Sequence, residues 1–249
     1  MPVPLYSALE TREWDRIGEN HPFAYHPSMD PREFSPSAER NRQPILEVLA
    51  RVLPPRGLVL EIGSGTGQHV VHFAKALPAL TFQPSEPDVE RHASIRAWTA
   101  DGKQSNVKPP LALDVTQLPW PVSTADALVC INVIHISPWE ATLALLCGAA
   151  NVLPAGGVLV TYGPYMRAGA HTAQSNEMFD ASLRARNPRW GVRDVDELIE
   201  AAGKVGLSLE ETVQMPANNF TLVWGKPKRT SPVAHTSRSS LTRASDQLA

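Results

Sequence analysis

Apolar residues along this chain alternate between short continuous runs and stretches with helical spacing. A continuous apolar run indicates a strand that is covered on both faces, and the runs predict strands at 57–62, 80–84, 109–114, 125–131 and 156–162. Between them, apolar residues spaced three and four apart predict helices at 67–77, 87–100 and 139–152. This alternation predicts an α/β fold, a mostly parallel sheet with helices on both faces.

The pattern changes after the fifth predicted strand. Two further helices are predicted at about 175–186 and 194–204, and two β-like runs follow at 207–213 and 219–225. A short polar connection between two such runs is typical of an antiparallel hairpin. We therefore expect a seven-stranded sheet that is parallel except for a C-terminal antiparallel hairpin.

The two ends of the chain differ in composition from its middle. Residues 1–34 are rich in proline, histidine and charge, which predicts an irregular N-terminal extension. A helix should follow, because Ser35 and Pro36 suit an N-cap and the first helical position. Residues 227–249 hold many serines, threonines and arginines and almost nothing apolar, which predicts a disordered basic tail. The folded domain should therefore cover residues 35–226.

Composition narrows the functional classes. The formal net charge of −2 argues against a nucleic-acid partner, and no apolar stretch reaches membrane-spanning length. Cys130 and Cys147 lack CxxC spacing and residues 1–9 lack the features of a secretory signal, so we expect a cytoplasmic protein without disulfides. His69 and His72 share a helix face without a third ligand nearby in sequence, so we predict no metal site. A protein partner would bind through the termini.

Three glycines mark the passage from the first predicted strand to the next helix. At Gly63, Gly65 and Gly67 a tight turn and the close approach of a ligand favour residues without a Cβ, and the following helix directs free N–H groups at that ligand. A dinucleotide fingerprint needs a glycine at the sixth position, which is Gln68 here. The glycine spacing, with Glu61 two residues before the first glycine, instead resembles the first motif of class I S-adenosylmethionine-dependent methyltransferases. An ordinary glycine-rich turn is the alternative.

Acidic residues follow the next predicted strands, at the sheet edge where such folds bind ligands. We expect Glu86, with Asp88 as the second candidate, to accept hydrogen bonds from ribose hydroxyls. We expect Asp114 to accept from the adenine amine and the Val115 backbone to contact the ring edge. Helix capping and turn formation are the alternatives for the acidic residues. Arg40 could pair with the cofactor carboxylate or lie on a solvated helix face. The full predicted cofactor set is Arg40, Glu61, Gly63, Ser64, Gly65, Gly67, Glu86, Asp114, Val115 and Asn132.

Further motifs carry a narrower resemblance. They lie at 34–41, 65–69, 132–139, 162–165, 175–180, 190–194 and 215–219. Together they are similar to one small family, the methyltransferase-like proteins of the twenty-six type, which contain a domain of unknown function. The resemblance covers residues 34–226 and implies a Rossmann-like class I methyltransferase fold. It implies no particular substrate.

Methyl transfer from a sulfonium needs a base only when the accepting atom arrives protonated. His135 is the leading candidate, because it follows the fourth predicted strand and its ordinary titration lies near neutrality. A core histidine with a satisfied hydrogen bond is the alternative. Asn132 and Tyr162 are predicted to bind or position the acceptor. Capping of the strand end is the alternative for Asn132, and ordinary packing is the alternative for Tyr162. Further candidates for the same pocket are Tyr165, Asn176 and Asp180.

These patterns together predict an S-adenosylmethionine-dependent methyltransferase with a small-molecule acceptor. A module that holds the cofactor without catalysis and acts through a protein partner is one alternative. An NAD-dependent oxidoreductase is another, which Gln68 at the sixth position of the motif disfavours.

Overall fold

The computed structural model describes residues 30–228. The residues from Arg32 onward belong to one compact unit. Most of the predicted N-terminal extension and nearly all of the predicted tail lie outside the described residues, so these two domain boundaries stay predictions.

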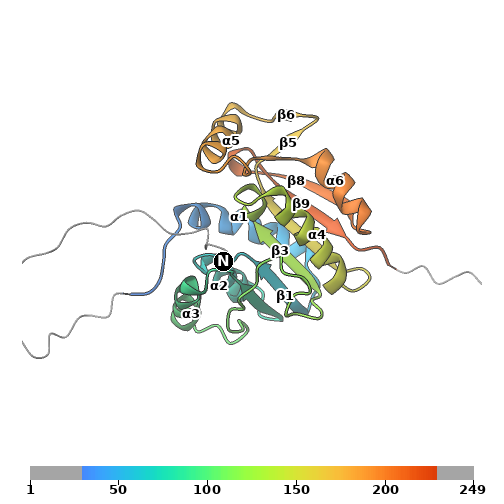
Figure 1. The fold of residues 1–249 in the computed structure, drawn as a ribbon. Coiled ribbons are helices and arrows are strands. Elements are labelled where there is room, and N and C mark those ends of the chain that lie inside the picture. Colours follow the sequence, from blue (N-terminus) through green and yellow to red (C-terminus); the bar gives the residue numbers. More distant parts are fainter. Residues whose placement is uncertain (1–29, 229–249) are drawn as a thin grey trace, which may run out of the picture. The chain divides into compact units, whose positions relative to one another are not determined.

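A six-stranded sheet with the order β2-β1-β3-β4-β9-β8 lies at the centre of the fold (Figure 1). Its strands are β1 (Gly57–Ile62), β2 (Leu80–Ser85), β3 (Ala127–Ile131), β4 (Val158–Gly163), β8 (Ser208–Met215) and β9 (Asn219–Gly225). The first four run parallel, and β9 runs antiparallel to both β4 and β8. The predicted α/β class with a mostly parallel sheet is therefore confirmed.

Helices cover both faces of this sheet (Figure 1). They are α1 (Pro36–Val52), α2 (Gln68–Ala76) and α3 (His92–Asp101) for one layer, and α4 (Trp139–Val152) and α6 (Val195–Lys204) for the other. Phe73 of α2 belongs to one core cluster with Val59, whereas Leu145 of α4 belongs to a second cluster with Leu60. Neighbouring residues of β1 thus face opposite layers, as the alternation of side chains along a strand requires. No helix among residues 30–228 has the length and apolar character needed to cross a membrane.

The strand predicted at 109–114 does not form, so the expected count of seven strands is wrong. This part of the chain makes only two isolated parallel bridges to β2, Val107 with Phe82 and Leu111 with Ser85. Two consecutive prolines lie between the bridges, and proline has no N–H to continue a ladder. The segment therefore follows the outer edge of β2 without becoming a strand.

A small second sheet follows the carboxyl end of β4, and the sequence did not predict it. Its strands β5 (Tyr165–Arg167), β6 (Ala170–His171) and β7 (Arg193–Asp194) have the order β6-β5-β7, and α5 (Gln174–Arg186) connects β6 to β7. Three single-turn helices complete the fold: η1 (Val89–Arg91), η2 (Val133–His135) and η3 (Pro216–Asn218). Strands of two or three residues are too short to show periodicity in a sequence.

Candidate functional site

The three glycines after β1 have left-handed backbone conformations, with φ of 68° at Gly63, 54° at Gly65 and 91° at Gly67. A Cβ at Gly63 would lie 2.5 Å from a methyl carbon of Val133, and one at Gly67 would lie 2.8 Å from the Cα of Ile95. A Cβ at Gly65 would meet only the end of one flexible arginine side chain, at 3.7 Å. Packing thus requires glycine at the outer two positions, whereas the backbone at Gly65 has open space beside it.

Hydrogen bonds from Ser64 and Gly65 connect this turn to the end of β2. The Ser64 N–H donates to the Ser85 carbonyl at 2.8 Å, and the Ser85 N–H donates to the Ser64 hydroxyl at 3.2 Å. The buried Glu86 carboxylate accepts from the Gly65 N–H at 2.9 Å and from the Asp88 N–H at 3.2 Å. The structure therefore brings the predicted ribose-binding carboxylate against the glycine turn.

Polar atoms without partners flank the turn on both sides in the sequence. Glu61 is 3% exposed, and among the described residues its Oε2 has no hydrogen-bond partner. Burial raises the pKa of Glu61 to about 7, the Ser64 hydroxyl lowers it, and the charge of Glu86 raises it. Gln68 is 2% exposed, and its Nε2 likewise lacks a partner, whereas its Oε1 accepts from the Ser35 N–H at 2.5 Å.

The unpartnered Oε2 of Glu61 is an acceptor, which suits the ammonium group of an amino-acid moiety. The unpartnered Nε2 of Gln68 is a donor, which suits its carboxylate group. We predicted no binding role for Gln68 from the sequence, because we considered only that this position lacks the glycine of a dinucleotide-binding motif.

Other predicted cofactor residues make local contacts. Asp114 is exposed, and its Oδ1 accepts from the Thr116 N–H at 2.9 Å and the Thr116 hydroxyl at 2.8 Å. The Val115 carbonyl accepts from the Trp120 indole N–H at 3.1 Å. Arg40 is exposed and donates at 3.3 Å to the hydroxyl of a serine one turn before it. These contacts agree with the turn and helix-face alternatives, and none of them involves the glycine turn.

The turn after β3 carries the predicted acceptor-side residues. Asn132 has a left-handed φ of 61°, and its N–H donates to the Tyr162 carbonyl at 2.8 Å. His135 is fully buried, and its ring packs edge-on against Tyr165 with 5.0 Å between ring centroids. A Cβ on Gly163 would lie 2.2 Å from the His135 Nε2, so this ring fills the space beside the glycine.

The protonation of His135 differs from the expectation. Burial and, to a smaller extent, the charge of Arg193 lower its pKa to about 3, so the ring is neutral at physiological pH. Neither ring nitrogen has a hydrogen-bond partner among residues 30–228, so the alternative of a satisfied core histidine does not describe it either. A neutral imidazole has one donor and one acceptor nitrogen, and here both are buried without a hydrogen-bond partner among the described residues.

Tyr162 connects this region to α1. Its hydroxyl bonds with Asn41 and Asn219, and burial raises its pKa, so the phenol stays protonated and can donate a hydrogen bond. The Asn41 Oδ1 lies 2.7 Å from the His69 Nε2, and the His72 ring contacts a glutamine of α1 at 3.2 Å. In the part of the chain that the structure describes, no three His, Cys, Asp or Glu side chains are grouped so that they could hold a metal ion.

Asn176 and Asp180 are buried in contacts around α5. The Asn176 amide donates to the Asn218 carbonyl at 2.9 Å. The Asp180 carboxylate accepts from the Val192 N–H at 2.7 Å and from the Arg184 Nε at 2.9 Å. Asn176 therefore connects α5 to η3, and Asp180 connects α5 to the segment before β7.

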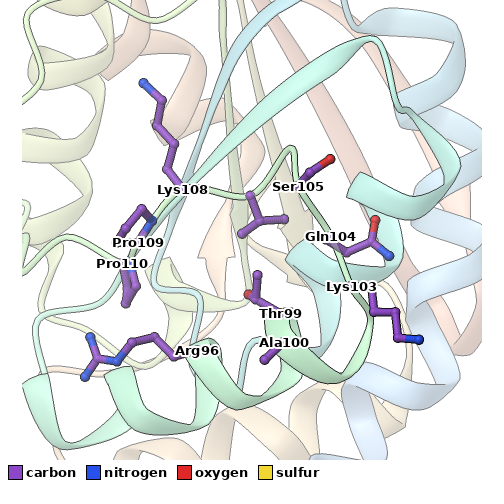
Figure 2. A pocket seen from close by; sticks show the side chains of 10 residues that line it. Arg96, Thr99, Ala100, Lys103, Gln104, Ser105, Lys108, Pro109 and Pro110 are labelled. Carbon is purple, nitrogen blue, oxygen red and sulfur yellow. The ribbon is translucent and has the colours of Figure 1, made fainter.

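A cavity of about 380 Å³ lies elsewhere, between α3 and the segment before residue 111 (Figure 2). Arg96, Lys103 and Lys108 line it together with Gln104 and with small or apolar side chains. None of the predicted site residues contributes to this cavity, so it is distinct from the site at the glycine turn.

A family model described as a protein of unknown function, DUF938, matches residues 32–226. The chain belongs to the DUF938 family. The description of the family names no activity.

Solved structures with the same fold include several proteins that are methyltransferases by name. TnmH is 22% identical, with a TM-score of 0.63 over 76% of this chain and 55% of that chain. CalO1, a methyltransferase in calicheamicin biosynthesis solved with SAH bound, is 19% identical, with a TM-score of 0.61 over 77% and 55%. The mitomycin 7-O-methyltransferase MmcR is 16% identical, with a TM-score of 0.65 over 76% and 55%. The chain spans 55% of the length of each of these proteins, and at such identities the similarity shows the fold.

Proposed function

We propose that this DUF938 protein is a methyltransferase that binds S-adenosylmethionine at the glycine turn and methylates a small molecule. The observation that carries the proposal is the turn itself, which is open at Gly65, bonded to Glu86 and followed by the orphaned amide of Gln68. The resemblance to the twenty-six type of methyltransferase-like proteins supports the same function.

The residues present fit this cofactor. The Glu86 carboxylate, which accepts from the Gly65 N–H in this structure, would accept from the ribose hydroxyls. The unpartnered Oε2 of Glu61 would accept from the α-ammonium, which favours the ionised carboxylate. Asp114 and Val115 would contact adenine after Asp114 gives up its bonds to Thr116. Arg40 would pair with the cofactor carboxylate.

The cofactor supplies an activated methyl group on a sulfonium. The chain has to align the accepting atom with this carbon and exclude water. Several solved structures with this fold are O-methyltransferases by name, which supports a hydroxyl group as the acceptor.

Three side chains would serve the acceptor hydroxyl. Tyr162 would donate a hydrogen bond through its protonated phenol, and Asn132 would position the acceptor beside the cofactor. The free nitrogen of the neutral His135 ring would accept the hydroxyl proton as the oxygen is methylated and, because the pKa of the ring is about 3, would pass this proton on to solvent.

Calorimetry with S-adenosylhomocysteine and NAD tests the cofactor site. Gly65→Val should abolish binding of S-adenosylhomocysteine, because the side chain fills the space that the ligand must occupy. Gly169→Val is the matched control: Gly169 has a φ of 75° and no atom within 4 Å of its ideal Cβ position, so it carries a similar backbone cost. Preferential binding of NAD, or equal binding by both variants, would overturn the proposal.

Methyl-labelled S-adenosylmethionine then separates an enzyme from a binding module. The protein is incubated with the labelled cofactor and with chromatographic fractions of a metabolite extract. Transfer of label to a small molecule is expected from the wild type and not from Gly65→Val. A wild type that binds the cofactor and labels no fraction would favour the non-catalytic alternative.

A further inference from the structure

The motif at residues 190–194 has no role in the function proposed above, yet it makes close contacts with the turn after β3. Three hydrogen bonds run from this segment to consecutive parts of that turn. The Arg193 Nε donates to the Ile134 carbonyl at 3.1 Å, the Gly191 N–H donates to the His135 carbonyl at 3.0 Å, and the Arg193 Nη2 donates to the Ser137 carbonyl at 2.5 Å. The contacts therefore lie on both sides of His135 and at His135 itself.

Arg193 is an unusual residue for this position. It is 9% exposed, and its guanidinium donates to backbone carbonyls, including that of Arg189 at 3.2 Å. Its guanidinium carbon also lies 5.7 Å from the ring centre of Trp139. Among residues 30–228 no carboxylate forms a direct ion pair with it. A buried cation is costly to desolvate, and the hydrogen bonds from the guanidinium N–H groups to these carbonyls offset that cost.

The segment that carries Arg193 is itself fixed from α5. Asp180 accepts from the Val192 N–H at 2.7 Å, and a Cβ on Gly191 would lie 2.7 Å from the Asp180 Oδ1. A side chain at position 191 would thus collide with α5 and displace the segment.

We propose that Arg193 is a positioning residue, which clamps the turn at residues 132–137 and so presents Asn132 and His135 at the carboxyl end of β3. The roles of Asn132 and His135 rest on the proposed function, whereas the clamp itself rests on the contacts above. Asn132 needs such support, because its left-handed backbone conformation is disfavoured in an isolated chain.

The clamp also places charge near the ring of His135. The groups that act on this ring are Arg193 from β7, the backbone of Gly191, Asp180 from α5 and the aromatic ring of Tyr165 from β5. The positive charge of Arg193 favours the neutral imidazole, and Asp180 opposes it more weakly. Arg193 therefore affects both the place of His135 and its protonation.

Two substitutions separate these effects. Arg193→Met removes the fork and the charge, whereas Arg193→Lys keeps the charge but cannot reach both carbonyls with a planar fork. Arg189→Met is the matched control, because Arg189 lies in the same region and its exposed side chain pairs with Glu140 at 3.1 Å.

Hydrogen exchange and ring titration by NMR on the ligand-free protein provide the readouts. Both Arg193 variants should speed exchange at the Ile136 and Gly191 amides about tenfold or more, the effect of losing a charged hydrogen bond. The pKa of His135 should rise in Arg193→Met and stay low in Arg193→Lys. Both variants should bind S-adenosylhomocysteine more weakly than the wild type, and Arg189→Met should resemble the wild type throughout.

The outcomes are distinct. Faster exchange across the whole domain, with no local excess at the turn and no change in the His135 titration, would show a general structural role and overturn the proposal. If Arg193→Met does not fold, the exchange rates of Arg193→Lys decide the question. If the wild type does not bind S-adenosylhomocysteine, the proposed function fails, whereas the exchange and titration data still test the clamp.

Discussion

Replacing Glu61 with glutamine should stabilise the ligand-free protein above neutral pH. Glu61 is 3% exposed, and burial raises its pKa from 4.5 to about 7. In the unfolded chain the carboxyl group ionises at its ordinary pKa, so the folded state binds the extra proton between these values. The contribution of Glu61 to stability is therefore fully present below pH 4.5 and is lost as the pH rises through about 7.

The size of this loss follows from the difference between the two pKa values. At about 1.4 kcal/mol for each unit of pH, the rise from 4.5 to about 7 corresponds to about 3 kcal/mol. Glutamine has nearly the same shape and does not ionise. The free energy of unfolding of Glu61→Gln relative to wild type should thus increase with pH and level off above about pH 7.

Urea denaturation of both proteins across this pH range measures the effect. Glu177→Gln is the control, because Glu177 is exposed on α5 and its substitution should change stability equally at every pH. A difference between wild type and Glu61→Gln that does not vary with pH would refute the reasoning from burial.

The same residue gives a signature of ligand binding. Near pH 6 the free protein holds a proton on Glu61, and a ligand ammonium beside Oε2 should expel it. Calorimetry with S-adenosylhomocysteine in buffers of different ionisation enthalpy should show proton release near pH 6 and much less near pH 8. Glu61→Gln should release no proton from this site and bind about 10- to 100-fold more weakly, the loss of one charged hydrogen bond. Binding by the wild type without proton release would show that Glu61 does not face the ammonium group.

Gly163→Ala should destabilise the protein by about 1–3 kcal/mol in urea denaturation, because its Cβ would lie 2.2 Å from the His135 Nε2. Gly203→Ala, with no atom within 4 Å in α6, should instead stabilise by about 0.5–1 kcal/mol, and equal effects would contradict the packing argument. The pKa of His135 is lowered from 6.5 to about 3, so stability is lost as the pH falls below 6.5, and His135→Gln should flatten this dependence. Iodoacetamide should modify Cys147 and spare Cys130 in the folded protein, because burial raises the pKa of the Cys130 thiol to about 12. Mass spectrometry measures the order of modification, and a result in which Cys130 is modified first would contradict this prediction.

The sequence was sufficient for the parts of the fold that depend on burial. Continuous apolar runs predicted the central strands, because a parallel strand covered on both faces has little room for polar side chains. The run at 109–114 is also apolar, yet it forms no strand, since an apolar pattern does not reveal how many N–H groups remain for a ladder. The two consecutive prolines were visible in the sequence and were the signal to demote this run.

In the candidate site too, the features set by a local motif could be predicted, whereas those set by packing could not. The conformations of Gly63, Gly65 and Gly67 follow from a local motif, so the sequence indicated the turn that the structure shows. The bond between Gly65 and Glu86 joins residues 21 positions apart, and it was within reach because both follow parallel strands. Whether Glu61 and Gln68 keep polar atoms unpaired depends on everything packed around them, and no spacing in the sequence reports that.

The protonation of His135 could not be predicted from the sequence. Its position after the fourth predicted strand was correct, but its protonation is set by residues from other elements, namely Gly163 and Tyr165, which bury the ring, and Arg193, which adds a charge. Arg193 contacts the turn across 59 and 56 positions of sequence, and it bonds to backbone carbonyls that any residue would provide. The identities of Ile134 and Ser137 therefore do not reveal this contact in the sequence. A motif can mark such a segment, but only the fold shows that its arginine holds the turn that carries His135.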